Sequence, residues 1–197
     1  MRIFVIRHGE AVDDIEDCYG GIADFVLTSQ GVEQAHLTAQ NLRDANIKVV
    51  YSSPLRRALQ TAEVICAGLG IARPTVVNGL QERNSYGVLS GVNKDKAKDI
   101  FGHIFATLKE KPGYSKELIP GCEPWDEFAV RVRDTFEMIT SAHADETIAL
   151  VTHGKFSQCL FEDVLKIKDK VDLKLSAVNV LDYRPVSASM GVAASVA

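Results

Sequence analysis

The sequence predicts an α/β fold of three layers, in which helices flank both faces of a mostly parallel central sheet. Short apolar segments rich in β-branched residues alternate along the chain with segments whose apolar residues recur every three or four positions. The first pattern is typical of buried strands and the second of amphipathic helices. Because the two kinds of segment alternate rather than forming separate blocks, a parallel sheet covered by helices is the favoured arrangement.

The predicted strands bring polar residues to one edge of that sheet. The strands are residues 3–6, 48–51, 75–77, 147–152 and 178–183. Three of them end in polar segments, which are Arg7-His8-Gly9, Ser52-Ser53-Pro54 and Thr152-His153-Gly154. Ligands of open α/β sheets bind beyond the carboxyl ends of the parallel strands. We therefore expect these segments to lie together at the functional site.

The segments between the strands are predicted as helices and loops. A helix beginning near residue 28 has Thr28 or Ser29 as a suitable N-cap, and the next helix follows Pro54 and ends at Gly68 and Gly70. The predicted helices are residues 28–45, 55–69, 95–108, 124–142 and 155–164. The predicted loops, residues 78–91 and 109–122, are rich in residues that favour turns.

Length and composition indicate one domain, residues 1–184, followed by a low-complexity tail, residues 185–197, that we expect to be poorly ordered. The formal net charge of −4 argues against broad nucleic-acid binding. No apolar run reaches the roughly 20 residues that span a bilayer, and the N-terminus does not resemble a signal peptide. The four cysteines are widely spaced, which is typical of reduced thiols. We expect a cytoplasmic protein without nucleic-acid or membrane partners, and the sequence does not indicate an oligomeric state.

The polar residues at the predicted edge suit phosphoryl transfer through histidine. Such chemistry requires a neutral imidazole as nucleophile and fixed cationic donors, ideally arginines, around the phosphoryl oxygens. It also requires a carboxylic acid that protonates the leaving group. His8 is the candidate nucleophile, since it follows a buried strand beside Arg7, and Gly9 leaves room for a substrate. A lone histidine at a strand end is more commonly satisfied by a backbone carbonyl, so its neighbours decide the matter.

The segment Arg7-His8-Gly9-Glu10 resembles the RHGE signature of the histidine phosphatase superfamily, the phosphoglycerate mutase-like proteins. Further motifs follow in the family's order from residue 2 to about residue 160. They are Asp24-Phe25-Val26-Leu27-Thr28 with Gly31, Gln34 and Ala35; Ser52-Ser53-Pro54-Leu55 with Arg57, Ala58, Gln60, Thr61 and Ala62; Leu80-Gln81-Glu82 with Tyr86, Gly87 and Gly91; Gly121-Cys122-Glu123-Pro124 with Phe128 and Arg131; and Thr152-His153-Gly154. The resemblance implies a phosphoglycerate mutase-like fold.

The resemblance also implies a role for each matching residue. His8 would be the nucleophile, Arg7 and Arg57 would hold the phosphoryl oxygens, and His153 would donate a further bond. Glu82 would protonate the leaving group and then activate water. Arg56 is the competitor of Arg57, but neighbours on a helix point about 100° apart, so only one can enter the site. Glu10 and Glu63 are the competitors of Glu82.

A second set of residues is expected to contact the substrate. The loop from Glu82 to Lys94 looks like the version found in mutases, with one extra residue before the tyrosine. If the resemblance holds, its side chains contact the part of the substrate that is not transferred. The substrate-binding residues expected are Gly9, Gly20, Gly21, Arg83, Tyr86, Lys94 and Gly154.

Other features favour a phosphatase over a mutase. Mutases of this family carry an arginine pair after the acid-bearing loop, whereas residues 94–120 here contain lysines and no arginine. Asp14 stands where the family has an asparagine that helps bind phosphate, so either Asp14 turns away or that binding point is lost. We expect a phosphomonoesterase of histidine acid phosphatase type, with a phosphohistidine intermediate, a small phosphorylated metabolite as substrate, and neither metal nor cofactor. The alternatives are a cofactor-type phosphoglycerate mutase and, with less support, a non-catalytic regulatory protein that binds phosphate ligands.

Overall fold

A six-stranded sheet forms the centre of the molecule, with the strand order β3-β2-β4-β1-β5-β6. The computed structural model describes residues 1–109, 119–143, 145–167, 171–184 and 193–196. The strands are β1 (Arg2–Arg7), β2 (Val49–Ser52), β3 (Thr75–Val76), β4 (Thr147–Thr152), β5 (Val178–Arg184) and β6 (Ala193–Val196). The pairings from β3 to β1 are parallel, and those of β5 with β1 and β6 are antiparallel. The prediction of a mostly parallel sheet is confirmed.

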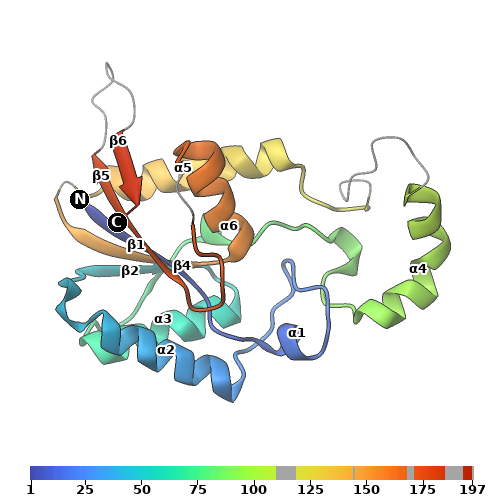
Figure 1. The fold of residues 1–197 in the computed structure, drawn as a ribbon, viewed down its shortest axis with the longest axis horizontal. Helices are drawn as coiled ribbons and strands as arrows, with labels where there is room; N and C mark the ends of the chain where they lie inside the picture. The colour runs from blue at the N-terminus through green and yellow to red at the C-terminus, as the bar shows by residue number, and fades with distance from the viewer. Residues whose placement is uncertain (110–118, 144, 168–170, 185–192, 197) are drawn as a thin grey trace.

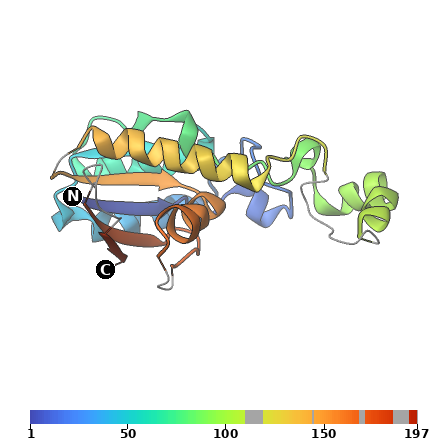
Figure 2. The ribbon, with the colours of Figure 1, turned by 90° about the horizontal axis from the view of Figure 1, so that it is seen from above.

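Helices cover both faces of the sheet, which confirms the three-layer prediction (Figures 1 and 2). On one face lie α2 (Ser29–Asn41) and α3 (Arg56–Leu69), and on the other lie α5 (Trp125–Ser141) and α6 (Gly154–Cys159). Each layer boundary has its own apolar cluster. Phe128, Phe136 and Phe156 pack under α5 and α6, whereas Ala58 and Ile65 pack under α2 and α3. Burial of these two clusters stabilises the packing of the helices against both faces of the sheet.

The termini of the helices follow from local chemistry. The side chain of Thr28 caps α2 by accepting a hydrogen bond of 3.0 Å from the Gly31 N–H. The chain leaves α3 at Gly70 with a φ of +71°, a conformation in which glycine has no steric penalty. Both residues were identified from the sequence as helix boundaries.

Several elements differ from the predictions. The helix expected over residues 28–45 ends at Asn41 and is followed by a 3-10 turn, Arg43–Ala45. The helix expected over residues 155–164 divides into α6 and a π-helical turn, Leu160–Val164. A short helix, α1 (Val12–Ile15), was not expected, and at four residues it has no apolar repeat to reveal it.

The tail also differs in part from the prediction. Residues 193–196 form β6, which pairs with β5 at the edge of the sheet, although the whole tail was predicted to be poorly ordered. Small residues are no obstacle there, because an edge strand gains its pairing from backbone groups rather than side chains. Residues 185–192 and 197 lie outside the described residues.

Helix α4 (Lys94–Lys109) lies at one end of the molecule, away from the sheet (Figures 1 and 2). Most of the loop predicted over residues 109–122 falls on residues 110–118, which are outside the described part of the chain. Among the described helices, none combines the length and apolar character that crossing a membrane requires.

Candidate active site

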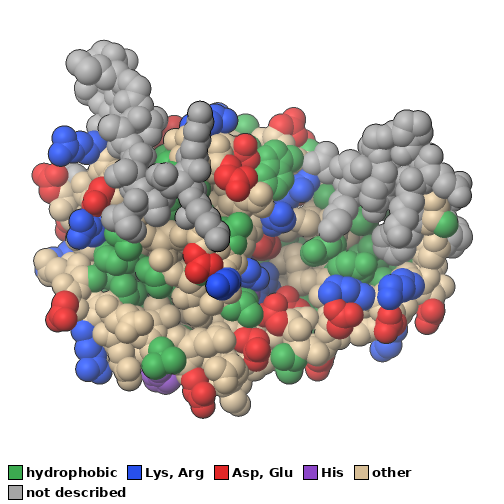
Figure 3. All heavy atoms as spheres, in the orientation of Figure 1, with side chains coloured by type: hydrophobic (Ala, Val, Ile, Leu, Met, Phe, Trp, Pro, Cys, Tyr) green, Lys and Arg blue, Asp and Glu red, His purple; other side chains and the backbone are tan. Residues whose placement is uncertain are grey.

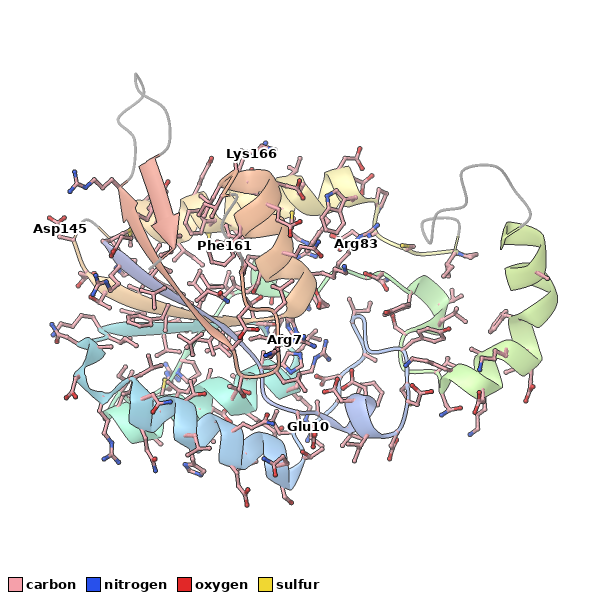
Figure 4. All side chains as sticks on the ribbon, in the orientation of Figure 1. Arg7, Glu10, Arg83, Asp145, Phe161 and Lys166 are labelled. Atoms are coloured by element: carbon pink, nitrogen blue, oxygen red, sulfur yellow. The ribbon has the colours of Figure 1, made fainter. Side chains whose placement is uncertain are left out.

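The three polar strand ends meet, as the sheet order requires. β1 and β2 both pair with β4, so the residues that follow these strands lie side by side. The His8 N–H donates to the Thr152 carbonyl over 3.0 Å, and the His8 and His153 rings lie 5.0 Å apart, centroid to centroid. Both imidazoles are buried. Figure 4 shows Arg7 at the end of β1 and below α6.

His8 is held in one orientation and one protonation state. Its Nδ1 lies 2.7 Å from the Gly9 carbonyl oxygen, which can only accept, so Nδ1 carries the proton. Its Nε2 then accepts a bond of 3.2 Å from Arg57 Nε. Burial, and after it the charge of Arg57, lowers the pKa of His8 well below the usual value. The imidazole is therefore neutral, with the lone pair of Nε2 at the site.

His153 has a hydrogen bond at one ring nitrogen and none at the other. Its Nε2 lies 2.8 Å from the Ser53 hydroxyl, whose oxygen also accepts from the Leu55 N–H over 3.3 Å. A hydroxyl has one donor and two acceptor sites, so this contact suits either neutral tautomer of His153. Its Nδ1 is buried and has no hydrogen-bond partner among the described residues. Burial, followed by the charge of Arg57, lowers the pKa of His153 well below its usual value. His153 is thus a neutral imidazole with one unused ring nitrogen.

Arg57 is the arginine that enters the site, and Arg56 is exposed. The Arg57 side chain is 2% exposed and donates from Nε to His8 and from its two terminal nitrogens to the carbonyls of Ala23 and Gly21. A guanidinium has five N–H groups, so these three bonds leave two for an anion. Burial lowers the pKa of Arg57, which remains a cation.

Arg7 brings a second guanidinium to the same place. One terminal nitrogen donates to the Leu173 carbonyl over 2.5 Å, while Arg7 Nε is buried without a partner among the described residues. Gly154 makes room for the group, since a Cβ built on Gly154 would lie 3.4 Å from the Arg7 guanidinium carbon. Arg7 Nε is a buried donor that an anion could satisfy, and His153 Nδ1 is a second one in the tautomer that carries its proton there.

Glu82 is the carboxylate that reaches this edge of the sheet. Its Oε1 accepts from the N–H groups of Arg83 and Phe156 over 2.9 and 3.2 Å, and its Oε2 accepts from the Lys155 N–H over 3.2 Å. These bonds hold the carboxylate at the first turn of α6, directly after His153. Of its competitors, Glu10 accepts a bond from the Thr28 hydroxyl and Glu63 is exposed on α3.

Arg131 and Glu123 fix the loop that carries Glu82. Arg131 donates to the carbonyls of Gly79, Gln81 and Glu82, and it pairs with both carboxylate oxygens of Glu123 at 2.8 and 2.9 Å. Bidentate pairing of this kind fixes direction as well as distance. Both residues were noted in the sequence as parts of a motif, but their function in positioning Glu82 was not inferred.

A cavity of about 210 Å³ opens beside Glu82. Its lining residues are Gly21, Glu82, Arg83, Ser85, Tyr86 and Lys155. The guanidinium carbon of Arg83 lies 5.0 Å from the ring centroid of Trp125, and Tyr86 packs on Tyr19. Ser85 directly precedes Tyr86 in the acid-bearing loop, and its buried Oγ has no hydrogen-bond partner within the described part of the chain. Neither Ser85 nor Lys155 was singled out from the sequence.

The sequence model of the histidine phosphatase superfamily (branch 1) matches residues 3–190. The chain belongs to this superfamily. A probable 2-carboxy-D-arabinitol-1-phosphatase of Arabidopsis thaliana is 30% identical over 189 residues, which are 93% of this chain and 38% of that protein. Phosphoglycerate mutase-like protein 4 of the same plant is 31% identical over 181 residues, which are 91% of this chain and 78% of that protein.

Solved structures of the superfamily share the fold. A mycobacterial glucosyl-3-phosphoglycerate phosphatase, in a complex with VO3, superimposes with a TM-score of 0.77 over 99% of this chain and 96% of that chain, at 21% sequence identity. The phosphoglycerate mutase-like fold is therefore confirmed. Because both phosphatases and mutases move a phosphoryl group, the relatives support an enzyme of phosphoryl transfer and leave its substrate open.

Three of the residues expected to bind the substrate have contacts of their own within the protein. Lys94 pairs with Asp17 and does not line the cavity. Gly20 lies against the Asp13 carboxylate. A Cβ on Gly9 would lie 2.6 Å from the Gly31 carbonyl oxygen, so the packing of α2 requires a residue without a side chain at this position.

Asp14, which stands in place of the family's asparagine, turns away from the phosphoryl-binding donors. Its Oδ2 accepts a hydrogen bond of 2.9 Å from the Ala11 N–H at the start of α1. Within the described residues, no group of three or more histidine, cysteine or acidic side chains is placed to hold a metal ion.

The two buried histidines predict a loss of stability in mild acid. Their pKa values are lowered from 6.5, so below pH 6.5 the unfolded chain binds protons that the folded chain does not. Stability therefore rises with pH in this window, and each histidine contributes up to about 1.4 kcal/mol of unfolding free energy per pH unit. Urea unfolding at pH 6.5 and 5.5 should show a slope that is shallower in His153→Asn than in the wild type. His36→Asn, at an exposed position on α2, is the control, and an equal slope in both variants would contradict the expectation.

Proposed function

We propose that this chain is a phosphomonoesterase that hydrolyses a small phosphorylated metabolite through a phosphohistidine at His8. The observation that carries the proposal is the state of His8, a buried neutral imidazole whose Nδ1 proton is bound by Gly9 and whose Nε2 lone pair faces Arg57. The unused donor Arg7 Nε and the unused ring nitrogen of His153 complete a site for an anion. A neutral nucleophile surrounded by fixed donors is what transfer of a phosphoryl group to histidine requires.

The reaction follows from this arrangement in two displacements. His8 Nε2 attacks phosphorus, the bond from phosphorus to the alcohol oxygen breaks, and protonated Glu82 gives its proton to the departing alkoxide. The Glu82 carboxylate then takes a proton from water, the resulting hydroxide attacks phosphorus, and the bond to Nε2 breaks. Orthophosphate leaves, and both His8 and Glu82 return to their starting states. Arg7, Arg57 and His153 stabilise the charge on the phosphoryl oxygens in both steps.

The leaving alcohol would occupy the cavity beside Glu82. A volume of about 210 Å³ suits a small metabolite rather than a phosphorylated protein. Arg83 and Lys155 give its lining two cationic side chains, which favours an alcohol that carries a carboxylate or another anionic group. The proposed substrate is therefore a small phosphomonoester with a second negative charge.

Hydrolysis is favoured over mutase activity because residues 94–120 contain no arginine, and two lysines of α4 are paired with acids. Lys94 and Lys98 pair with Asp17 and Asp95, and Figure 3 shows basic and acidic side chains next to one another on the surface at that end of the molecule. A mutase has to retain its intermediate until the phosphoryl group is returned, which needs strong contacts to the bound substrate. Mutase activity is the second candidate, favoured by the similarity of the loop from Glu82 to Lys94 to the mutase version.

The release of orthophosphate from a panel of small phosphomonoesters tests the proposal. We expect turnover, fastest with esters of anionic alcohols, and no isomerisation of phosphoglycerate when a bisphosphate primer is added. Isomerisation that depends on the primer and exceeds hydrolysis would identify a mutase. Binding of orthophosphate without turnover of any ester would identify a non-catalytic binding protein.

A further inference from the structure

Asp13 has a carboxylate oxygen without a hydrogen-bond partner among the described residues, and it lies against the loop whose carbonyls hold Arg57. It lies on α1, and its Oδ2 rests so close to Gly20 that a Cβ there would lie 2.2 Å from it. Its Oδ1 is buried and accepts no hydrogen bond from the described residues. The neighbouring Asp14 accepts a hydrogen bond from the Ala11 N–H, so the two acids of α1 differ in their hydrogen bonding. A buried acceptor without a donor needs an explanation.

The two arginines of the candidate site also influence the charge of Asp13. Arg57 on α3 and Arg7 on β1 both act on the carboxyl group and lower its pKa, whereas Asp14 raises it. Burial is the largest influence, and the net result is that the pKa of Asp13 is raised. Arg57 donates instead to the carbonyls of Gly21 and Ala23, on the loop that continues from Gly20. Asp13 therefore lies against the loop that holds the Arg57 guanidinium, and these two described side chains form no ion pair with each other.

An anion bound at this site would meet the Asp13 carboxylate. Oxygens held by Arg7 and Arg57 carry negative charge, and two anions side by side cannot both remain ionised without a large cost. A proton on Oδ1 removes the repulsion and gives the buried oxygen a hydrogen-bond partner. A carboxylic acid is the only form of Asp13 that can donate to a phosphoryl oxygen.

We propose that binding of a phosphoryl group at this site takes up one proton from solvent, carried by Asp13, whose acid form donates a hydrogen bond from Oδ1 to a phosphoryl oxygen. This inference rests on the proposed function only in that the site binds phosphoryl groups. The proton is returned to solvent when orthophosphate leaves, so the overall reaction is unchanged. Asp13 thus determines how phosphoryl affinity depends on pH.

The proposal predicts that the wild type and Asp13→Asn differ in how their affinity for phosphate depends on pH. Above the pKa of Asp13 the wild type must recruit a proton, so its affinity for phosphate falls by about tenfold for each pH unit relative to Asp13→Asn. The amide donates without a proton from solvent. Because titration of the ligand itself is common to both proteins, the ratio of their affinities reports on Asp13 alone.

Calorimetric titration of the full chain with orthophosphate tests the proposal. Titrations at pH 6 and pH 8, each in two buffers that differ in ionisation enthalpy, give the number of protons taken up. We expect the wild type and Glu16→Gln to take up one proton more than Asp13→Asn at pH 8, and the dissociation constant of Asp13→Asn to be at least about tenfold lower than theirs at that pH. Glu16 is the matched control, since it is exposed near the end of the same helix.

Equal proton uptake by the wild type and Asp13→Asn would overturn the proposal, and so would weaker phosphate binding by the variant at pH 8. If Asp13→Asn does not fold, Asp13→Ala gives the same proton count, because it also lacks the carboxyl group. The assay measures binding and not turnover. If the protein binds phosphate with the extra proton but hydrolyses no ester, the proposed function is wrong and the inference on Asp13 is supported.

Discussion

Replacing His8 with alanine is expected to lower phosphomonoester hydrolysis by about 10⁵-fold, the order of loss seen when other covalent nucleophiles are removed. The variant keeps Arg7, Arg57 and His153, so it retains most of the charge that binds a phosphoryl group. It lacks the one neutral nitrogen whose lone pair faces that charge. The loss should therefore appear in kcat, while orthophosphate still binds.

Retained binding of orthophosphate separates this expectation from misfolding, and a trapping measurement tests the phosphohistidine itself. Rapid acid-free denaturation of the wild type during turnover of a phosphorus-labelled ester should trap a phosphoryl group that is stable in base and labile in acid, and His8→Ala should trap none. His36→Ala, at an exposed position on α2, should trap the same amount as the wild type. Full activity of His8→Ala against every ester in the panel would contradict the mechanism.

The position of the site follows from the topology of the chain, which is why it could be predicted. Polar residues after β1, β2 and β4 come together because these parallel strands are neighbours and end at the same edge. The choice between Arg56 and Arg57 could also be made from the sequence, since helical geometry allows only one of them to face the sheet. The structure buries Arg57, in agreement with the register of the motif.

The contacts that set the state of each histidine could not be predicted. Ser53 and His153 are 100 positions apart, and Arg57 and His8 are 49 apart. No local pattern shows which nitrogen of a ring will meet which donor, because that depends on the packing of α3 against the sheet. The Ser53 hydroxyl that meets His153 Nε2 is itself held by the Leu55 N–H, which is a detail of the turn before α3.

The support of Glu82 and the position of Asp13 were hidden for different reasons. Arg131 projects from α5 to carbonyl groups of a loop some 50 residues earlier, and backbone acceptors have no sequence signature. Asp13 and Asp14 are adjacent and chemically alike, so the sequence could not show which of them faces the donors. Only the short helix α1, which directs Asp14 toward Ala11, distinguishes them.

Replacing Glu82 with glutamine is expected to separate substrates by the quality of their leaving group. For an alkyl phosphate, whose alkoxide must be protonated as it departs, kcat/KM should fall by about 10²- to 10⁴-fold. For a nitrophenyl phosphate, whose leaving group needs little protonation, kcat/KM should stay within about tenfold of the wild type. The substitution is mild, because the amide oxygen can keep the bonds from Arg83 and Phe156, and only the bond from Lys155 is lost. Glu63→Gln, at an exposed carboxylate on α3, is the control for removal of a charge.

The same variant tests the proposed role of Glu82 as the base of the second step, because water attacks the phosphohistidine as a base accepts its proton. With nitrophenyl phosphate, Glu82→Gln should release about one equivalent of nitrophenol rapidly and then turn over slowly, since capture by His8 is intact and hydrolysis is not. A uniform loss for alkyl and nitrophenyl esters without this burst would show that Glu82 positions α6 rather than transferring protons. In that case another group would have to protonate the leaving alcohol, and Asp13, whose carboxylate lies against the loop that holds Arg57, is the next candidate.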